Sequence, residues 1–177
     1  MKRIFRVTAI VLVVLIAAFF ALRAFTKSKS PEATAAYKQN GLNVEVKYCQ
    51  PAKKDRELFG KLLPYGKVWR TGANEATIIN FEKPVSINGK ALAAGSYSLW
   101  TIPNPKEWTI IFNKQTGQWG TMYDEKQDIL RVNAPASEKP ELTEIFTISF
   151  VPDTAGAKML LVWDKTQVTV PVALAKN

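Results

Sequence analysis

Short segments with a two-residue hydrophobic period are the feature that most restricts how this chain can fold. Between residues 42 and 48, apolar residues alternate with Asn43, Glu45 and Lys47. Such alternation predicts a β-strand with one buried face and one solvated face. Further strands are predicted over residues 76–81, 85–87, 95–102, 107–113, 129–132, 144–151, 158–164 and 167–172.

The connections between these segments contain residues typical of tight turns. Asn88-Gly89 suits the positive φ angles of a two-residue hairpin turn, and Pro103-Asn104-Pro105 requires a loop. No segment between the strands is long enough for the crossover helix that parallel strands need. The sequence therefore predicts an all-β fold, an antiparallel β-sandwich of about nine strands, in one domain over residues 37–177.

The N-terminal segment has the composition of a targeting element. Lys2, Arg3 and Arg6 precede an uninterrupted apolar stretch over residues 7–22, which is the layout of an export signal or signal anchor. This stretch is shorter than the about 20 residues that span a bilayer comfortably, and flanking residues can supply the difference. We assign residues 1–25 to a hydrophobic helix that is a signal anchor or signal peptide, and residues 26–36, which are small and polar, to a linker.

The end of the apolar stretch favours a retained anchor over a cleaved leader. Residues 18–24, with the sequence AFFALRA, place bulky or charged residues where a signal peptidase requires small ones. The basic N-terminus favours a topology with the domain outside the cytoplasm. The predicted location is the cell envelope, with the domain anchored to the membrane, or exported if the leader is cleaved.

Composition excludes several classes of function. The chain has no histidine, which removes histidine general bases, histidine-activated nucleophiles and histidine zinc sites. The single cysteine, Cys49, has no internal disulfide partner and is expected to be buried. Residues 1–30 hold six of the 24 basic residues and no acid, so the rest of the chain is close to neutral. We expect no nucleic-acid partner, no metal and no cofactor.

Two irregular segments, residues 62–77 and residues 114–124, carry the densest clusters of aromatic and polar side chains in the sequence. If they lie at the same end of the sandwich, their aromatic rings can stack on a small molecule or a glycan while polar groups bind its hydroxyls or a carboxylate. The candidate ligand-binding residues are Trp69, Arg70, Asn74, Glu75, Gln118, Trp119, Tyr123 and Asp124.

Three interpretations of these segments stay open. The first is a ligand-binding or interaction module. The second is a hydrolase of envelope glycans that uses Glu75 and Asp124 as paired carboxylates, although the chain contains no recognised catalytic motif. The third is purely structural, with Trp69 in the core and an ion pair between Arg70 and Glu75 that fixes a long loop.

Several separated blocks are similar to the family called domain of unknown function 2911. The likeness extends over most of the region from Leu42 to Pro171. The resemblance implies an exported bacterial protein and assigns it no activity, so no catalytic residue follows from it. The blocks are LFG at residues 58–60, PYGKVWRTGANEAT at 64–77, AGSYSL at 94–99, NKQTGQWGT at 113–121 and YDEK at 123–126.

Overall fold

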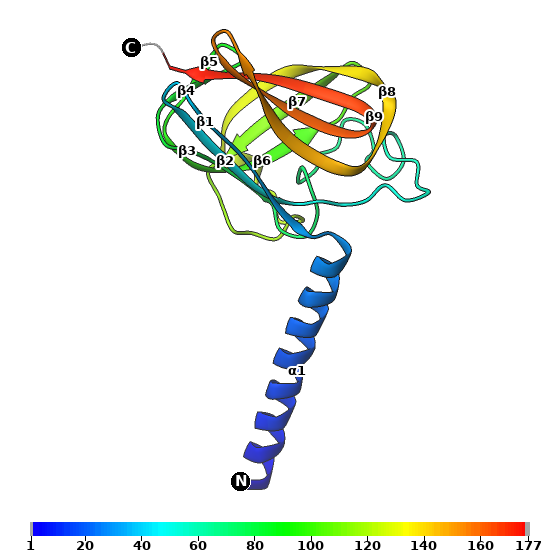
Figure 1. Ribbon diagram of the computed structural model, residues 1–177. Helices are drawn as coiled ribbons and strands as arrows, with labels where there is room; N and C mark the ends of the chain where they lie inside the picture. Colours follow the sequence, from blue (N-terminus) through cyan, green and yellow to red (C-terminus); the bar gives the residue numbers. More distant parts are fainter. Residues whose placement is uncertain (1, 176–177) are drawn as a thin grey trace.

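A computed structural model describes residues 2–175 of the chain. It consists of one long N-terminal helix and a body of antiparallel strands (Figure 1). The elements are α1 (Lys2–Lys29), β1 (Glu32–Gln39), β2 (Leu42–Cys49), β3 (Thr77–Phe81), β4 (Val85–Ile87), β5 (Lys90–Leu92), β6 (Gly95–Ile102), β7 (Glu107–Asn113), the short 3₁₀ helix η1 (Glu125–Gln127), β8 (Asp128–Asp153) and β9 (Gly156–Leu174).

The strands form a nine-stranded sheet in the order β1-β2-β3-β6-β7-β8-β9-β4-β5, and neighbouring strands are antiparallel. The long strands β8 and β9 fold this sheet over on itself. The first part of β8 pairs with β7, and the remainder, from Ala136, pairs with β9 with register shifts between Glu138 and Thr147. In Figure 1, these long strands run across the upper part of the body, and β1 and β2 run through its lower left. The predicted all-β antiparallel fold is confirmed.

The core lies between the two layers that this folding creates. Tyr48 of β2 packs edge-on against Phe146 of β8, with ring centroids 5.8 Å apart. The Tyr48 hydroxyl accepts a hydrogen bond from the Ile148 backbone amide at 2.9 Å. A smaller apolar cluster on the other face of the sheet contains Trp100 and Ile111. The loop between β7 and β8 covers it, because the Tyr123 ring packs 5.0 Å from Trp100.

The period-two segments identify most strands closely. The strands β4, β6 and β7 have the predicted bounds, and Asn88 and Gly89 adopt the positive φ angles of the predicted hairpin turn. Other predicted bounds were wrong. The segments 129–132 and 144–151 belong to one strand, β8, and the segments 158–164 and 167–172 belong to β9. Both strands continue through bends, such as Asp164 with a φ of 54°, where the alternation is interrupted.

The linker predicted over residues 26–36 differs from the structure. Helix α1 continues to Lys29, and residues 32–36 form the first part of β1, which pairs with β2 over its whole length. The inward positions of β1 are occupied by Ala33, Ala35 and Tyr37. The residues between them include a further alanine, so the hydrophobic alternation is weak in the sequence. As a result, only residues 30 and 31 separate helix from sheet.

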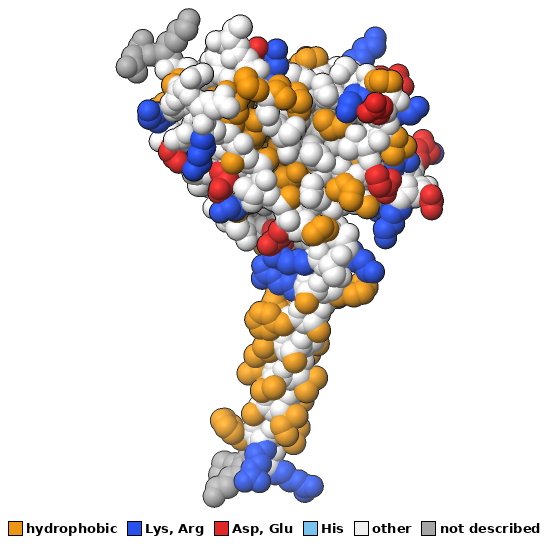
Figure 2. Space-filling model, viewed as in Figure 1, with side chains coloured by type: hydrophobic (Ala, Val, Ile, Leu, Met, Phe, Trp, Pro, Cys, Tyr) orange, Lys and Arg blue, Asp and Glu red, His pale blue; other side chains and the backbone are white. Residues whose placement is uncertain are grey.

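Helix α1 projects from the body along most of its length (Figure 1). Figure 2 shows apolar side chains along its shaft and basic side chains at both ends. The segment Arg3–Lys29 is long and apolar enough to cross a membrane, and none of its apolar window is buried against the body. Signal sequences share this length and composition, so the helix fits either an anchor or a signal peptide.

Candidate functional site

The loop between β2 and β3 and the loop between β7 and β8 are joined by backbone hydrogen bonds. The Ala76 amide donates to the Gln118 carbonyl at 3.2 Å, and the Gly120 amide donates to the Asn74 carbonyl at 3.0 Å. Glu75 and Trp119 form an isolated antiparallel bridge. The structure therefore places the two segments with the candidate residues side by side. We name these paired backbones the loop junction (residues 74–76 and 118–120).

The loop junction lies at the end of the body from which α1 leaves. The Asn74 side chain donates to the carbonyl of Ser30, directly after the helix, at 3.5 Å. A cavity of about 350 Å³ lies between the loops and the last turns of α1. The body lines it with Glu75, Gly117 and Trp119, and α1 lines it with Phe19, Leu22, Arg23 and Thr26.

An adjoining cavity of about 450 Å³ shares Arg23, Glu75 and Gly117 with the first. We call the first of these cavities, at Trp119, the helix-side cavity. Trp119 is 37 % exposed and lines this cavity, so part of its side chain is accessible there. An accessible indole next to a carboxylate and a guanidinium can hold a ligand that has an apolar part and a polar part.

Glu75 is paired with basic residues of the helix. Its Oε1 lies 2.6 Å from Arg23 Nη2 and 3.6 Å from Lys27 Nζ, and Lys27 also pairs with Glu32 at the start of β1. Figure 2 shows acidic and basic side chains together where α1 meets the body. Partial burial raises the pKa of Glu75, but its backbone hydrogen bond and the charges of Lys27 and Arg23 outweigh burial and hold that pKa below its usual value.

Arg70 does not form the ion pair with Glu75 that the structural interpretation included. Its Nη1 donates to the Asn74 carbonyl at 3.2 Å, and no ion pair of Arg70 occurs within the part of the chain that the structure describes. The side chain lies directly against Gly120, because a Cβ placed on that glycine would be 2.2 Å from Arg70 Cδ. Burial lowers the pKa of the Arg70 guanidinium. Arg70 therefore packs against the loop junction and does not line the helix-side cavity.

Trp69 and Gln118 point into the body instead of into the helix-side cavity. Trp69 is 7 % exposed, and its ring stacks on Trp163 with centroids 5.7 Å apart. The Gln118 amide donates to Ser98 Oγ at 3.2 Å, and its buried Oε1 has no hydrogen-bond partner among residues 2–175. Neither side chain lines the cavity.

Tyr123 and Asp124 hold the β7–β8 loop in place. The Tyr123 hydroxyl donates to Asp128 at 2.6 Å and accepts from Arg131 at 2.9 Å. Burial and the neighbouring Asp128 carboxylate raise the pKa of Tyr123 far above its usual value. Asp124 caps η1 by accepting from the Lys126 amide at 3.0 Å. Glu75 and Asp124 therefore have separate partners. Their use as paired carboxylates in a hydrolase stays a prediction.

Several residues around the loops were not identified from the sequence. The α1 wall of the cavity belongs to the apolar targeting segment, and nothing in its composition indicates a contact with loops more than 50 residues away. The ion pair of Arg131 with Asp128 at 2.7 Å also went unnoticed, although an acid three residues before an arginine is a visible signal. Cys49 is buried, and burial raises the pKa of its thiol. Residues 2–175 contain no cluster of three or more metal-ligating side chains.

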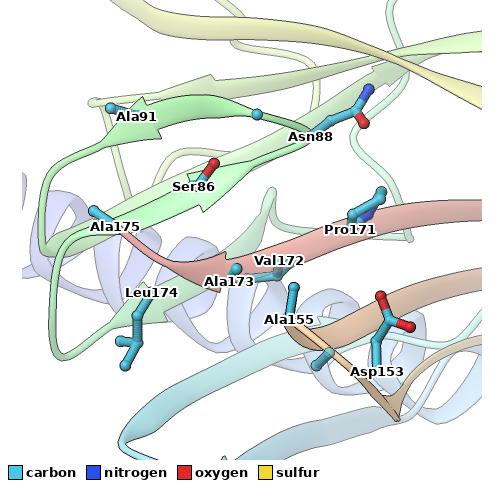
Figure 3. A pocket seen from close by; sticks show the side chains of 12 residues that line it. Ser86, Asn88, Ala91, Asp153, Ala155, Pro171, Val172, Ala173, Leu174 and Ala175 are labelled. Carbon is cyan, nitrogen blue, oxygen red and sulfur yellow. The ribbon is translucent and has the colours of Figure 1, made fainter.

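A further cavity, of about 540 Å³, lies between the β4–β5 hairpin and the tip of the β8–β9 hairpin (Figure 3). Small side chains such as Ala91 and Ala155 line much of it, and none of its lining residues within residues 2–175 is aromatic or basic. Its carboxylate, Asp153, pairs with Lys158 at 3.0 Å. None of the candidate residues lines this cavity. The helix-side cavity is therefore the better candidate for a ligand.

Replacing Arg23 with glutamine should raise the pKa of Glu75 towards its ordinary value. The folded-state pKa is depressed, so the pairing stabilises the helix–body junction at neutral pH and is lost as pH falls through that depressed value. An NMR titration of the Glu75 carboxylate in detergent micelles measures the change, with Glu75→Gln used for assignment. Arg3→Gln, at the opposite end of α1, should leave the titration unchanged. Equal titrations in Arg23→Gln and the parent chain would contradict the assigned pairing.

The comparisons with known proteins bear on the body and not on the helix. No curated protein and no solved structure is detectably similar to the chain. A family model matches residues 30–172, which begins directly after α1 and includes both segments of the loop junction. The resemblance noted in the sequence is thereby confirmed. The chain belongs to the family described as "Protein of unknown function (DUF2911)".

Proposed function

We propose that the chain is a membrane-anchored binding module of the cell envelope, with its ligand site in the helix-side cavity. The observation that carries the proposal is the bridge between Glu75 and Trp119. It brings a carboxylate and an accessible indole to one cavity, at the end of the body where an apolar helix leaves. Arg23 supplies a positive charge to the same cavity.

A retained anchor is supported by the part that α1 plays in the site. Arg23 and Lys27 are the charged partners of Glu75, and Phe19 and Leu22 form an apolar wall of the cavity. Cleavage after residue 24 would remove Arg23, Phe19 and Leu22 together. The three basic residues near the N-terminus support a topology with that end in the cytoplasm and the body outside it.

The candidate residues take different roles in this proposal. Glu75 and Trp119 face the ligand. Arg70, Asn74 and Gln118 hold the loop junction through the contacts described above, and Tyr123 and Asp124 fix the β7–β8 loop. Trp69 belongs to the core. In this proposal, only Glu75 and Trp119 of the candidate residues contact the ligand. The other candidate residues stabilise the conformation of the loops or belong to the core.

Tryptophan emission tests the proposal in the full chain, solubilised in detergent micelles. Of the five tryptophans, Trp69, Trp100, Trp108 and Trp163 are buried, so ligand-dependent changes report mainly on Trp119. Two probes are titrated separately, a soluble muropeptide and a short-chain phospholipid. We expect a saturable blue shift with at least one probe, which Trp119→Phe abolishes.

Glu75→Gln should weaken the affinity about tenfold for a probe whose amine or hydroxyl group donates to the carboxylate, since a hydrogen bond to a charged group contributes about 1.5 kcal/mol or more. Asp124→Asn is the matched control, because asparagine retains the oxygen that caps η1 and the position lies outside the cavity. Its affinity should equal that of the parent chain. The absence of a saturable shift with both probes, or equal weakening by the two substitutions, would contradict the proposed site.

A further inference from the structure

We propose that the occupant of the helix-side cavity is a phospholipid of the outer leaflet, and that Trp119 and Met122 dip into the bilayer surface beside α1. The inference rests on the proposed anchorage and names the ligand class of that site. The lipid's acyl chain lies along Phe19 and Leu22, and its phosphate lies at the level of Arg23.

Two large apolar side chains of one turn are exposed, and one of them, Trp119, lies beside the helix. The Met122 amide donates to the Trp119 carbonyl at 2.8 Å, which places both residues in a tight turn. Met122 is 61 % exposed and Trp119 is 37 % exposed. Trp119 lines the cavity together with Phe19 and Leu22. The apolar surface of α1 therefore continues onto the body, and a lipid that covers the helix also covers this turn.

The length of the apolar stretch determines how close the Trp119–Met122 turn lies to the bilayer. Residues 7–22 extend about 24 Å along the helix axis at 1.5 Å per residue, which is less than the about 30 Å of a bilayer's hydrocarbon core. A short span is accommodated by bringing flanking groups into the interface. Only residues 30 and 31 separate α1 from β1, and the Arg23–Glu75 pair holds the body against the helix. The loop junction therefore lies at the bilayer surface.

The side chains at this level match the boundary between head groups and acyl chains. Trp119 lies beside the last apolar turn of α1, and tryptophan is enriched at that boundary because its ring is apolar with one polar end. The last two turns of the helix, residues 23–29, carry three basic residues, Arg23, Lys27 and Lys29. Guanidinium and ammonium groups bind phosphate through charge-assisted hydrogen bonds. This order of apolar ring and then positive charge is the order of acyl chain and phosphate in a phospholipid.

Quenching by brominated lipids tests the inference. The full chain is reconstituted into phosphatidylglycerol and phosphatidylethanolamine vesicles that carry bromine either near the head group or near the end of the acyl chain. Flotation on a density gradient first establishes anchorage. We expect head-group-proximal bromine to quench the emission more strongly than deep bromine, and Trp119→Phe to remove most of that quenching.

A second variant distinguishes insertion from general proximity to lipid. Val151→Trp in the Trp119→Phe background places an exposed indole near the β8–β9 hairpin tip, which lies at the opposite end of the body from α1 (Figure 1). Its emission should not respond to bromine. A chain that floats but shows no Trp119-dependent quenching would overturn the lipid assignment and leave the proposed binding function standing. A chain that fails to float would overturn both.

Discussion

Replacing Trp69 with alanine should lower the free energy of unfolding by about 4 kcal/mol, in the range for truncating a buried aromatic residue. The ring stacks on Trp163 and meets Phe146 edge-on at 4.9 Å. It also contacts Trp108, with centroids 6.1 Å apart. Alanine would leave a cavity among three aromatic rings that cannot collapse without moving β7, β8 and β9. Denaturant unfolding in detergent micelles, followed by near-ultraviolet circular dichroism, measures the loss.

Two further variants separate the contributions to this loss. Trp69→Phe keeps an aromatic ring but removes the donor to the Gly72 carbonyl, 3.1 Å away, and should cost about 1–2 kcal/mol for the unpaired carbonyl and lost contacts. Trp119→Ala, at an exposed position, should cost about 1 kcal/mol or less. Equal losses at positions 69 and 119 would show that Trp69 is not the centre of the core that the structure indicates.

The strands could be predicted because their signal is local. In β2, each inward position from Leu42 to Tyr48 is apolar and each position between them is polar, so the pattern alone gives the face. Strand β1 carries Thr34 and Ala36 between the inward residues Ala33, Ala35 and Tyr37 and gives little contrast. Its place in the sheet comes from pairing with β2, which follows a tight turn at Asn40 and Gly41. That is tertiary information, and composition alone indicated a linker.

The candidate site was predictable as a pair of segments and not as a set of side chains. Period-two reasoning has no rule for an irregular loop, so the direction of Trp69 and of its neighbour Arg70 could not be derived. One is directed into the aromatic core and the other lies against Gly120. The partner of Glu75 was inaccessible for a different reason. Arg23 belongs to the targeting segment, 52 residues earlier, and sequence reasoning treats such a segment separately from the fold.

Gly120→Ala should be the most damaging substitution at the loop junction, with a loss of about 3 kcal/mol, the upper part of the usual range for overpacking. An added Cβ would lie 2.2 Å from Arg70 Cδ and 2.6 Å from the Asn74 carbonyl oxygen. The arginine side chain can move, but the carbonyl is backbone and accepts the Gly120 amide hydrogen bond. Relief therefore requires the two loops to separate. Denaturant unfolding and the emission maximum of Trp119 both report on that separation.

Gly117→Ala is the matched control within the same loop. Gly117 has a φ of +80° and no neighbour within 4 Å of an added Cβ, so alanine there meets only backbone strain of roughly 1–2 kcal/mol. Gly120 has no such φ, and its substitution tests close approach alone.

Combining Gly120→Ala with Arg70→Ala removes the nearest contact but keeps the one with the Asn74 carbonyl. We expect the double variant to remain destabilised relative to Arg70→Ala alone. Full recovery would show that the arginine stem, and not the joined backbones, sets the distance between the loops. The joined backbones are the basis of the proposed site, because their bridge is what brings Glu75 and Trp119 to one cavity.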